Sequence, residues 1–243
     1  MPLNPLIIIP ARMAATRLPG KPLADIHGLP MIVHVLNRAK AGASGPVVVA
    51  TDTKEIADVV KKAGGEAVLT KPEHPSGTDR VLEAVQIYDP QGQYETIVNI
   101  QGDLPTLQPQ AVAAAIALLA DRNVDISTPA ALITTDEEKT SQAVVKIAGT
   151  PISSTRLRAH YFSRNCIPSG DGPLYHHIGL YGYQREALEK FCALPPSYLE
   201  LREKLEQLRA LENGMRIDIA IVDYAPFGVD TPADLERARA MLK

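Results

Sequence analysis

The feature that most constrains the fold is a repeated alternation of strand-like and helix-like segments. Apolar runs rich in Ile and Val lie at residues 6–10, 46–52, 66–70, 96–103 and 125–133. Helix-like stretches lie between them at residues 30–42, 53–65, 77–88 and 109–120. Because strands joined by helices usually pair in parallel and are covered on both sides, the pattern predicts an α/β fold: a mostly parallel, Rossmann-like sheet with helices on both faces.

The rhythm of the sequence changes after about residue 143. A Pro- and Gly-rich stretch extends to residue 173, and YHHIGLYGY follows at 175–183. Two helical segments, a strand at 216–223 and a last helix after VDTPADL complete the chain. We expect a single domain, 1–243, with a smaller embedded lobe at about 150–215, although 243 residues would also accommodate two domains.

Charge, hydropathy and cysteine content exclude several classes of protein. With 25 basic and 28 acidic residues the net charge is −3, so the molecule as a whole should attract neither nucleic acid nor an anionic membrane. No run of about 18 apolar residues could span a bilayer, and the first residues lack a signal peptide, which together predict a cytoplasmic protein. Cys166 and Cys192 are too few for a disulfide framework or a cysteine zinc site, and we expect both to be reduced.

The stretch IIIPARMAATRLPGK carries a cluster of basic residues directly after the first predicted strand. Arg12, Arg17 and Lys21 fall within ten positions, with small residues between them. Ligands of such sheets bind beyond the carboxyl ends of the strands, and guanidinium and ammonium groups suit the oxygens of a triphosphate. The loop is not a Walker A motif, because Pro22 stands where Ser or Thr would be needed. A merely solvated loop is the alternative.

Two aspartates, one after a predicted strand and one before the last predicted helix, could complete a nucleotide site. Asp103 follows the strand in NIQGDLP, at the same predicted sheet edge as the basic loop, although it could simply begin a turn. Asp230 precedes the last helix and could be its N-cap, but Thr231 and Asp234 already form a capping-box pattern. Carboxylates beside phosphates require a hard cation between them, so we expect Mg²⁺.

Two later segments carry polar groups that could face a sugar or a second subunit. In YHHIGLYGY, strand alternation places His177, Tyr181 and Tyr183 on one face and apolar residues on the other, although a purely structural histidine is an alternative. In LREKLEQLRAL, a single helix with an apolar stripe at Leu201, Leu205 and Leu208 would leave Glu206 and Gln207 off the stripe, where solvated side chains are the default.

The motif PAR-x-x-x-TRLPGKPL resembles the signature of the sugar nucleotidyltransferases, and specifically of the cytidylyltransferases that act on 3-deoxy acidic sugars. The resemblance extends almost end to end, in order and spacing, through GLPMIVHV, VVVATD, HPSGTDR, QGD-x-P, YFSR, HHIGLYGY, LREKLEQLR and GVDTPADLERAR. It implies the nucleotidyltransferase version of the α/β sheet, with the second lobe serving the sugar and dimerisation.

The resemblance assigns the nucleotide site. It implies that CTP is bound by Ala11, Arg12, Arg17, Lys21, Ser76, Arg80, Gln101 and Gly102. It also implies that Arg12, Lys21, Asp103 and Asp230 are catalytic, and that Asp103 and Asp230 hold Mg²⁺. Ser76 could instead be only the N-cap of the following helix.

The sugar site follows from the same resemblance. It is expected to contain Arg80, Arg164, His177, Tyr181, Glu206 and Gln207, with Arg164 pairing with the sugar carboxylate. Two features depart from the family pattern. Relatives commonly read QGDEP where this chain has Leu104, and the loop at 169–173 is short.

The implied activity is transfer of CMP from CTP to 3-deoxy-D-manno-octulosonate (KDO) with release of pyrophosphate, by a homodimer, activating the sugar for lipopolysaccharide synthesis. The alternatives are a cytidylyltransferase for another acidic sugar, a GT-A-like glycosyltransferase and a non-catalytic nucleotide-binding module. The glycosyltransferase would normally carry a DxD motif, which does not follow these strands.

Overall fold

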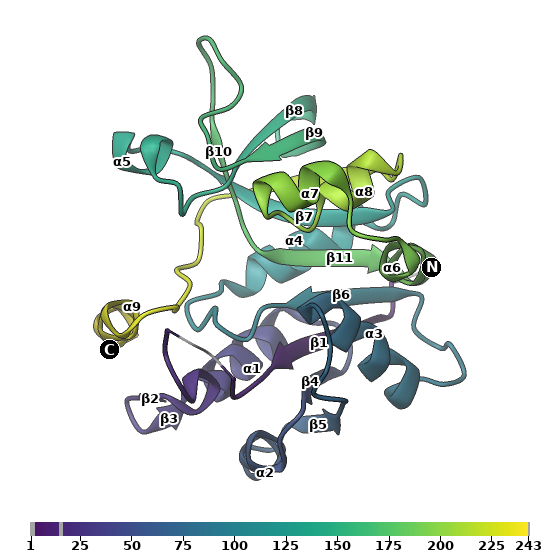
Figure 1. Cartoon of the computed structure of the whole chain (residues 1–243), viewed down its shortest axis with the longest axis vertical. Helices are drawn as coiled ribbons and strands as arrows, with labels where there is room; N and C mark the ends of the chain where they lie inside the picture. The colour runs from purple at the N-terminus through teal and green to yellow at the C-terminus, as the bar shows by residue number, and fades with distance from the viewer. Residues whose placement is uncertain (1–2, 15–16, 243) are drawn as a thin grey trace. The chain divides into compact units, whose positions relative to one another are not determined.

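The computed structural model describes residues 3–14 and 17–242 and divides into two compact units (Figure 1). Unit 1 comprises Met1–Ala113 and Pro226–Lys243, and unit 2 comprises Ala114–Ala225. Both units are built from strands and helices, and the predicted α/β fold class is confirmed.

Unit 1 contains the parallel sheet that the sequence predicts. Its strands lie in the order β6 (Thr96–Ile100), β1 (Pro5–Ala11), β4 (Val47–Thr51) and β5 (Glu66–Leu69). β1 pairs in parallel with both β6 and β4, and β4 pairs in parallel with β5. The central strands are buried on both faces, which explains their unbroken Ile and Val runs.

The strand order in unit 1 creates a topological switch point beside β1. The helix α1 (Met31–Gly42) leads from β1 to β4, α2 (Lys54–Lys62) leads from β4 to β5, and α3 (Gly77–Tyr88) returns to β6 on the other side of β1. Right-handed crossovers therefore place α3 on the opposite face from α1 and α2. The carboxyl ends of β1 and β6 lie side by side at the position where such sheets bind ligands.

The end of the chain returns to unit 1 and packs against its first loop. After β1 come η1 (Lys21–Leu23) and a short hairpin of β2 (Asp25–Ile26) and β3 (Leu29–Pro30), while α9 (Pro232–Met241) closes the chain. A buried cluster contains Ile26, Met31, Val229, Leu235 and Ala238. The guanidinium of Arg239 donates to the carbonyl oxygen of Asp25. These contacts hold the segment before α9 next to the basic loop.

Unit 2 contains a mixed sheet. Its strand order is β10 (Tyr175–His177), β8 (Lys146–Ser153), β9 (Arg156–Ser163), β12 (Ile217–Val222), β7 (Ile126–Leu132) and β11 (Leu180–Gln184), and β10 also pairs with β7. β7 and β12 are parallel, whereas β8 with β9 and β9 with β12 are antiparallel. Its helices are α5 (Asp136–Thr140), α6 (Arg185–Ala193), α7 (Tyr198–Glu203) and α8 (Leu208–Glu212), and α4 (Pro109–Leu118) crosses the unit boundary.

Two elements predicted as continuous are interrupted. The segment 175–183 is not one strand: β10 pairs with β7 near Ala131, whereas β11 pairs with it near Ser127. The segment 201–211 is not one helix, because Lys204 adopts a left-handed conformation with φ 55° and ends α7. Leu201 is 65% exposed, so it does not belong to the buried stripe.

The Pro- and Gly-rich stretch also contains more regular structure than we expected. Residues 146–163, which include the first part of this stretch, form the β8–β9 hairpin, and Leu157, Ala159 and Phe162 are buried in it. Both cysteines are free thiols, as expected.

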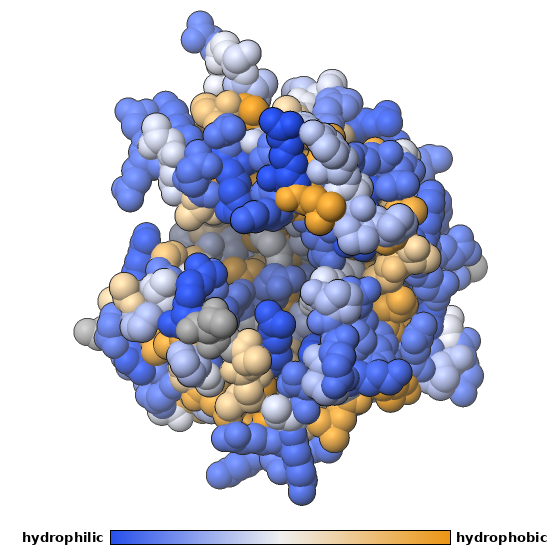
Figure 2. All heavy atoms as spheres, in the orientation of Figure 1, coloured by the Kyte–Doolittle hydropathy of each residue, from blue (hydrophilic) through white to orange (hydrophobic). Residues whose placement is uncertain are grey.

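The visible surface mixes polar and apolar side chains without a large apolar area (Figure 2). Among the described helices, none combines the length and apolar character needed to cross a membrane.

Candidate active site

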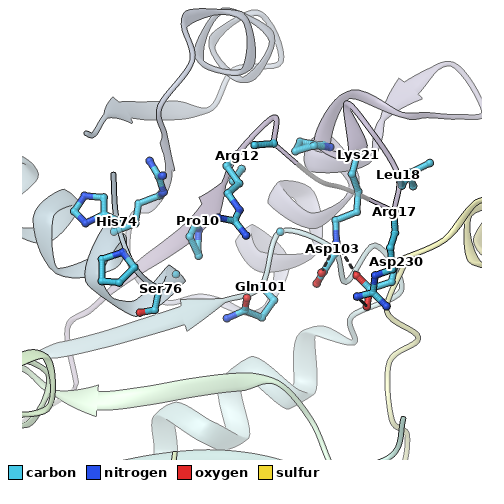
Figure 3. A pocket seen from close by; sticks show the side chains of 17 residues that line it. Pro10, Arg12, Arg17, Leu18, Lys21, His74, Ser76, Gln101, Asp103 and Asp230 are labelled. Carbon is cyan, nitrogen blue, oxygen red and sulfur yellow. Dashed lines mark hydrogen bonds and ion pairs between the residues drawn. The ribbon is translucent and has the colours of Figure 1, made fainter. Parts of the chain in front are cut away.

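A cavity of about 330 Å³ lies at the switch point of unit 1 (Figure 3). Its lining comes from residues 10–12, 14, 17–18, 21–22, 74–77, 80, 101–103 and 230. These are the end of β1 with the basic loop, the start of α3, the end of β6 and the residue before α9. The lining includes four Lys or Arg side chains and two aspartates, so the cavity carries the excess positive charge that an anionic ligand requires.

Lys21 lies between the two predicted carboxylates. Its Nζ donates to Oδ2 of Asp103 at 2.7 Å and to Oδ1 of Asp230 at 3.0 Å. Gly20, with φ 68°, turns the loop immediately before Lys21, and Pro22 is buried after it. Burial disfavours the charged form of Lys21, but attraction and hydrogen bonding from Asp103 and Asp230 outweigh it and raise the pKa of Lys21 above its ordinary value.

Asp103 reaches the cavity because β6 ends very close to β1. A Cβ atom on Gly102 would lie 2.8 Å from the carbonyl oxygen of Pro10, so only glycine permits this approach. The carbonyl oxygen of Asp103 accepts from the backbone N–H of Val229 at 2.9 Å. This hydrogen bond joins the strand end that carries Asp103 to the segment that carries Asp230.

The Asp230 carboxylate is not used to cap α9. The cap is Thr231, whose Oγ1 accepts from the backbone N–H of Asp234 at 3.2 Å. Oδ2 of Asp234 accepts in return from the backbone N–H groups of Thr231 and Asp230. The structure therefore leaves the carboxylate of Asp230 to face Lys21 and Arg17, as the capping pattern predicts.

The other two cations of the loop differ in their contacts. Arg17 pairs with Oδ2 of Asp230 at 3.1 Å, but its side chain is 67% exposed, so this ion pair is weak. Arg12 projects from the end of β1 into the cavity (Figure 3). Within the described residues its guanidinium has no ion-pair partner, which leaves it available for an anionic ligand. Ala11, the last residue of β1, is buried beside it.

The start of α3 forms the opposite wall of the cavity. Ser76 is the N-cap of α3, and its Oγ accepts from the backbone N–H groups of Thr78 and Asp79, so Ser76 has a structural role, while its predicted contact with CTP stays a prediction. It also lines the cavity. Gln101 lines the cavity from the end of β6, and its Nε2 donates to Oδ1 of Asn99 at 3.3 Å.

Arg80 is buried and already engaged in several hydrogen bonds. Its guanidinium donates to Oγ1 of Thr70 at 2.5 Å, to the carbonyl oxygens of Lys71 and Pro72, and to Oδ2 of Asp52 at 3.3 Å. Arg80 thus fixes the loop before α3. Its predicted contact with CTP or sugar stays a prediction, and supporting this loop is the role that its hydrogen bonds describe.

His74 is a cavity residue that the sequence reasoning missed. It lines the cavity and forms a hydrogen-bonded pair with Glu83, whose carboxylate also accepts from the backbone N–H of Lys71. Burial disfavours the charge of Glu83, but the hydrogen bonds from His74 and Lys71 outweigh it and lower the pKa of Glu83. His74 is the first residue of the motif HPSGTDR, just before the predicted start of a helix, and this position could have identified it as a cavity residue.

Apart from Arg80, the predicted sugar residues lie in unit 2, where the structure brings His177 and Tyr181 together. His177 is buried, and the centroids of its ring and the Tyr181 ring are 5.4 Å apart. Oγ1 of Thr128 donates to the carbonyl oxygen of Ile178, so it must accept from Nε2–H of His177. Burial lowers the pKa of His177 to about 3, and the neutral ring retains an acceptor at Nδ1.

Glu206 and Gln207 lie between α7 and α8. Gln207 is 5% exposed, and its Nε2 is buried without a hydrogen-bond partner within the described residues. Burial is the main cause that raises the pKa of Tyr181, and the negative charge of Glu206 adds to it. The Glu206 carboxylate therefore lies close enough to Tyr181 to act on its hydroxyl group. A buried amide without a partner is costly unless a ligand or water satisfies it.

Arg164 is held in a different way. Its guanidinium donates to the carbonyl oxygen of Gln142 at 2.9 Å, and its own carbonyl oxygen accepts from Nζ of the buried Lys146 at 3.0 Å. Its role toward a sugar carboxylate stays a prediction.

The two aspartates satisfy a simple test for a magnesium site. Their carboxylate oxygens already share one cationic partner, and Mg²⁺ prefers such hard oxygen ligands. No group of three or more His, Cys, Asp or Glu side chains suited to a metal occurs within residues 3–14 and 17–242. Phosphate and water oxygens would therefore have to supply the remaining ligands, which is how Mg²⁺ usually binds with nucleotides. Leu104, at the position where the family pattern led us to expect an acid, is buried beside Gly228 and adds no ligand.

Comparisons with known proteins agree on one family. The family model described as Cytidylyltransferase matches residues 6–217. A 3-deoxy-manno-octulosonate cytidylyltransferase from Methylobacterium nodulans is 63% identical over 98% of this chain and 97% of its own length. The protein of the same name from Rhodopseudomonas palustris is 64% identical, with the same coverage.

Solved structures extend this similarity to the fold. The structure of CMP:2-keto-3-deoxy-manno-octonic acid synthetase complexed with CTP superposes with a TM-score of 0.90, at 36% identity over 98% of each chain. A UDP-glucose pyrophosphorylase complexed with UDP-glucose superposes with a TM-score of 0.68 over 99% of this chain and 98% of its own. At 13% identity, this second likeness concerns the fold alone.

Proposed function

The chain belongs to the cytidylyltransferase family, and we propose that it transfers CMP from CTP to KDO with release of pyrophosphate. It is thus a nucleotidyltransferase. The observation that carries this proposal is the convergence of Lys21, Asp103 and Asp230, from three distant parts of the sequence, in a cavity with excess positive charge.

In this proposal the basic loop binds the triphosphate of CTP. Arg12, which has no ion-pair partner among the described residues, and Lys21 contact phosphate oxygens and stabilise the charge that develops on the departing pyrophosphate. Arg17 adds charge at the solvent side. The backbone at Ala11 and Gly102, with Ser76 and Gln101, forms the walls against which the nucleotide is positioned.

The chemical step is a direct displacement. The anomeric hydroxyl oxygen of KDO loses its proton to solvent water and forms a bond to the α-phosphorus of CTP, while the bond from that phosphorus to the bridging oxygen of pyrophosphate breaks. Asp103 and Asp230 would hold Mg²⁺, which when bound supplies Lewis-acid neutralisation of phosphate charge. The protein contributes position and charge, so no covalent enzyme intermediate is expected.

For the sugar, we propose that unit 2 supplies the polar contacts. Neutral His177 offers a hydrogen-bond acceptor at Nδ1, and the buried amide of Gln207 offers a donor, both suited to hydroxyl groups. Tyr181 and Glu206 accompany them, and Arg164 is proposed to pair with the sugar carboxylate. The CMP-sugar would serve lipopolysaccharide synthesis in the cytoplasm.

We also propose a homodimer. The aromatic segment 175–183 supplies less surface than we expected, because two of the three side chains on its predicted outer face, His177 and Tyr183, are buried within unit 2. Exposed Leu132 and Ile152, on strands of the same unit, support the proposal instead. Sedimentation equilibrium at micromolar concentration should give twice the chain mass of 26.2 kDa, and a 26.2 kDa particle would refute the dimer.

Pyrophosphate release tests the function. With CTP and Mg²⁺, we expect release to depend on KDO and to be slower with other acidic sugars at equal concentration. Faster release with a different acidic sugar would reassign the substrate. Binding of CTP without release of pyrophosphate in the presence of any of the sugars would indicate a non-catalytic nucleotide-binding module.

A further inference from the structure

The ammonium group of Lys21 lies between the two carboxylates that would bind the metal. Its Nζ is 2.7 Å from Asp103 and 3.0 Å from Asp230, and the Lys21 side chain is only 18% exposed. Charge-assisted hydrogen bonds of this length are strong in a partly buried site. A divalent cation bound by the same carboxylates would place its charge next to that of Lys21, and the two cations would repel each other.

We propose that Lys21 is an internal counter-ion of Asp103 and Asp230, that it competes with the divalent metal for them, and that metal binding displaces its ammonium toward the triphosphate. This inference deepens the proposed function and rests on its assignment of the two aspartates to the metal. It gives one lysine two successive partners, first the carboxylates and then the phosphates. Metal and nucleotide binding are coupled as a result. The metal displaces the Lys21 ammonium from the carboxylates and so frees it for the phosphates, and the phosphates give that ammonium a new partner.

The local structure confines the required movement to the side chain. The backbone N–H of Lys21 donates to the carbonyl oxygen of Leu18 at 3.1 Å, and its carbonyl oxygen accepts from the N–H of Ala24 at 3.1 Å. The next residue, Pro22, is buried. The backbone at Lys21 is thereby fixed, whereas the four-carbon stem of lysine can rotate its charge to a new partner.

The same loop offers a matched control. Arg12 carries the same charge and lines the same cavity, but it forms no ion pair with either aspartate among the described residues. Replacing Arg12 measures how much the general positive charge of the loop opposes metal binding. Replacing Lys21 removes a similar amount of charge and also removes the direct competition between its ammonium and the metal for the two carboxylates. Lys21→Met and Arg12→Met are therefore the informative pair.

The experiment measures Mn²⁺ binding without nucleotide, by the paramagnetic resonance signal of free Mn²⁺. We expect Lys21→Met to bind Mn²⁺ about tenfold more tightly than the wild type, because a charge-assisted competitor has been removed. Arg12→Met should lie within about twofold of the wild type. Lys21→Ala should behave like Lys21→Met, and thermal melting of each variant identifies any that does not fold.

The outcomes separate this inference from the proposed function. Unchanged or weaker Mn²⁺ binding in folded Lys21→Met and Lys21→Ala overturns the competition, as does equal tightening in Arg12→Met, which would indicate only a general field. If Asp103→Asn and Asp230→Asn bind Mn²⁺ as the wild type does, the aspartates are not the metal ligands and the metal part of the proposed function fails as well. Sugar-dependent pyrophosphate release by the wild type tests the transfer reaction independently.

Discussion

Nζ of Lys21 lies 2.7 Å from Oδ2 of Asp103, although 82 positions separate the two residues in the sequence. The contact exists because β1 and β6 are parallel neighbours, so their carboxyl ends meet at one sheet edge. Lys21 lies in the loop after β1, and Asp103 follows β6 at that edge. The topology of unit 1 thus creates the charged centre of the proposed active site.

Replacing either aspartate should remove most activity without unfolding the protein. We expect Asp103→Asn and Asp230→Asn each to lower kcat by about 10²–10³-fold and to weaken its dependence on magnesium concentration. The double variant should be little worse than either single one, because groups that act as a unit are not additive. Steady-state kinetics across a magnesium titration, with melting temperatures on the same samples, provides the measurement.

Asp234 is the matched control for Asp230. Asp234→Ala removes the reciprocal capping contacts of α9 and should cost about 1 kcal/mol in the free energy of unfolding. Its magnesium dependence should stay close to that of the wild type. A variant of Asp230 that keeps full turnover and its magnesium response would show that Asp230 only shapes the turn.

Lys21→Ala should lower kcat/KM by the equivalent of about 2–4 kcal/mol of transition-state stabilisation, as expected for loss of a preorganised charge. Arg17→Ala should have a smaller effect, because the Arg17 side chain is 67% exposed and its charge is screened. The kinetic constants of the two variants at one magnesium concentration check the ranking, and wild-type turnover in Lys21→Ala would remove Lys21 from the mechanism.

The buried His177 should make the stability of the protein depend on pH. Its folded pKa of about 3 lies below the ordinary value of 6.5, so between these values the unfolded chain binds more protons than the folded one. The contribution of neutral His177 to the free energy of unfolding is complete above pH 6.5 and decreases as the pH falls toward 3. Titration of this residue changes the free energy of unfolding by at most about 1.4 kcal/mol per pH unit.

His177→Gln should flatten that slope. Urea unfolding of the wild type and the variant at several pH values between 4 and 7 gives the two curves, and the difference between them isolates His177 from the other titrating groups. Parallel curves would mean that His177 is not held neutral in the fold.

The break between α7 and α8 predicts unequal costs for two similar leucines. Leu205 is buried, so Leu205→Ala should cost about 2–4 kcal/mol in the free energy of unfolding. Leu201 is 65% exposed, and its replacement by Ala should change stability by no more than about 0.5 kcal/mol. Equal losses in urea unfolding would instead support one continuous helix with both leucines in its buried stripe.

The first half of the chain could be predicted closely because its signals are strong. The strands β1, β4 and β6 are buried on both faces, which requires continuous runs of Ile and Val, and the helices between them carry their own apolar periodicity. Lys21 and Asp103 could then be placed at one edge from strand order, whereas only the family resemblance brought Asp230 beside them. That the Asp230 carboxylate is not needed to cap α9 followed from the capping pattern after it.

The second half was harder to predict because its structure depends on local exceptions. Nothing in the apolar pattern of LREKLEQLRAL requires the left-handed conformation of Lys204 that ends α7. In β9, however, Leu157 and Ala159 alternate with Arg156 and Arg158, a period of two that would have indicated a strand. The residues that support Arg80, such as Asp52 and Thr70, come from separate loops, and only the folded arrangement reveals them.

Phosphorus NMR of a reaction containing the protein, CTP, Mg²⁺ and KDO tests the proposed transfer most directly. We expect the three phosphate signals of CTP to disappear together, replaced by one phosphodiester signal of the CMP-sugar and by pyrophosphate in equal molar amounts. Both products should be absent when KDO is omitted, and they should form about 10²–10³-fold more slowly when Asp103→Asn replaces the wild type. Pyrophosphate formed to the same extent without KDO, or CTP that remains intact in the complete mixture, would contradict it.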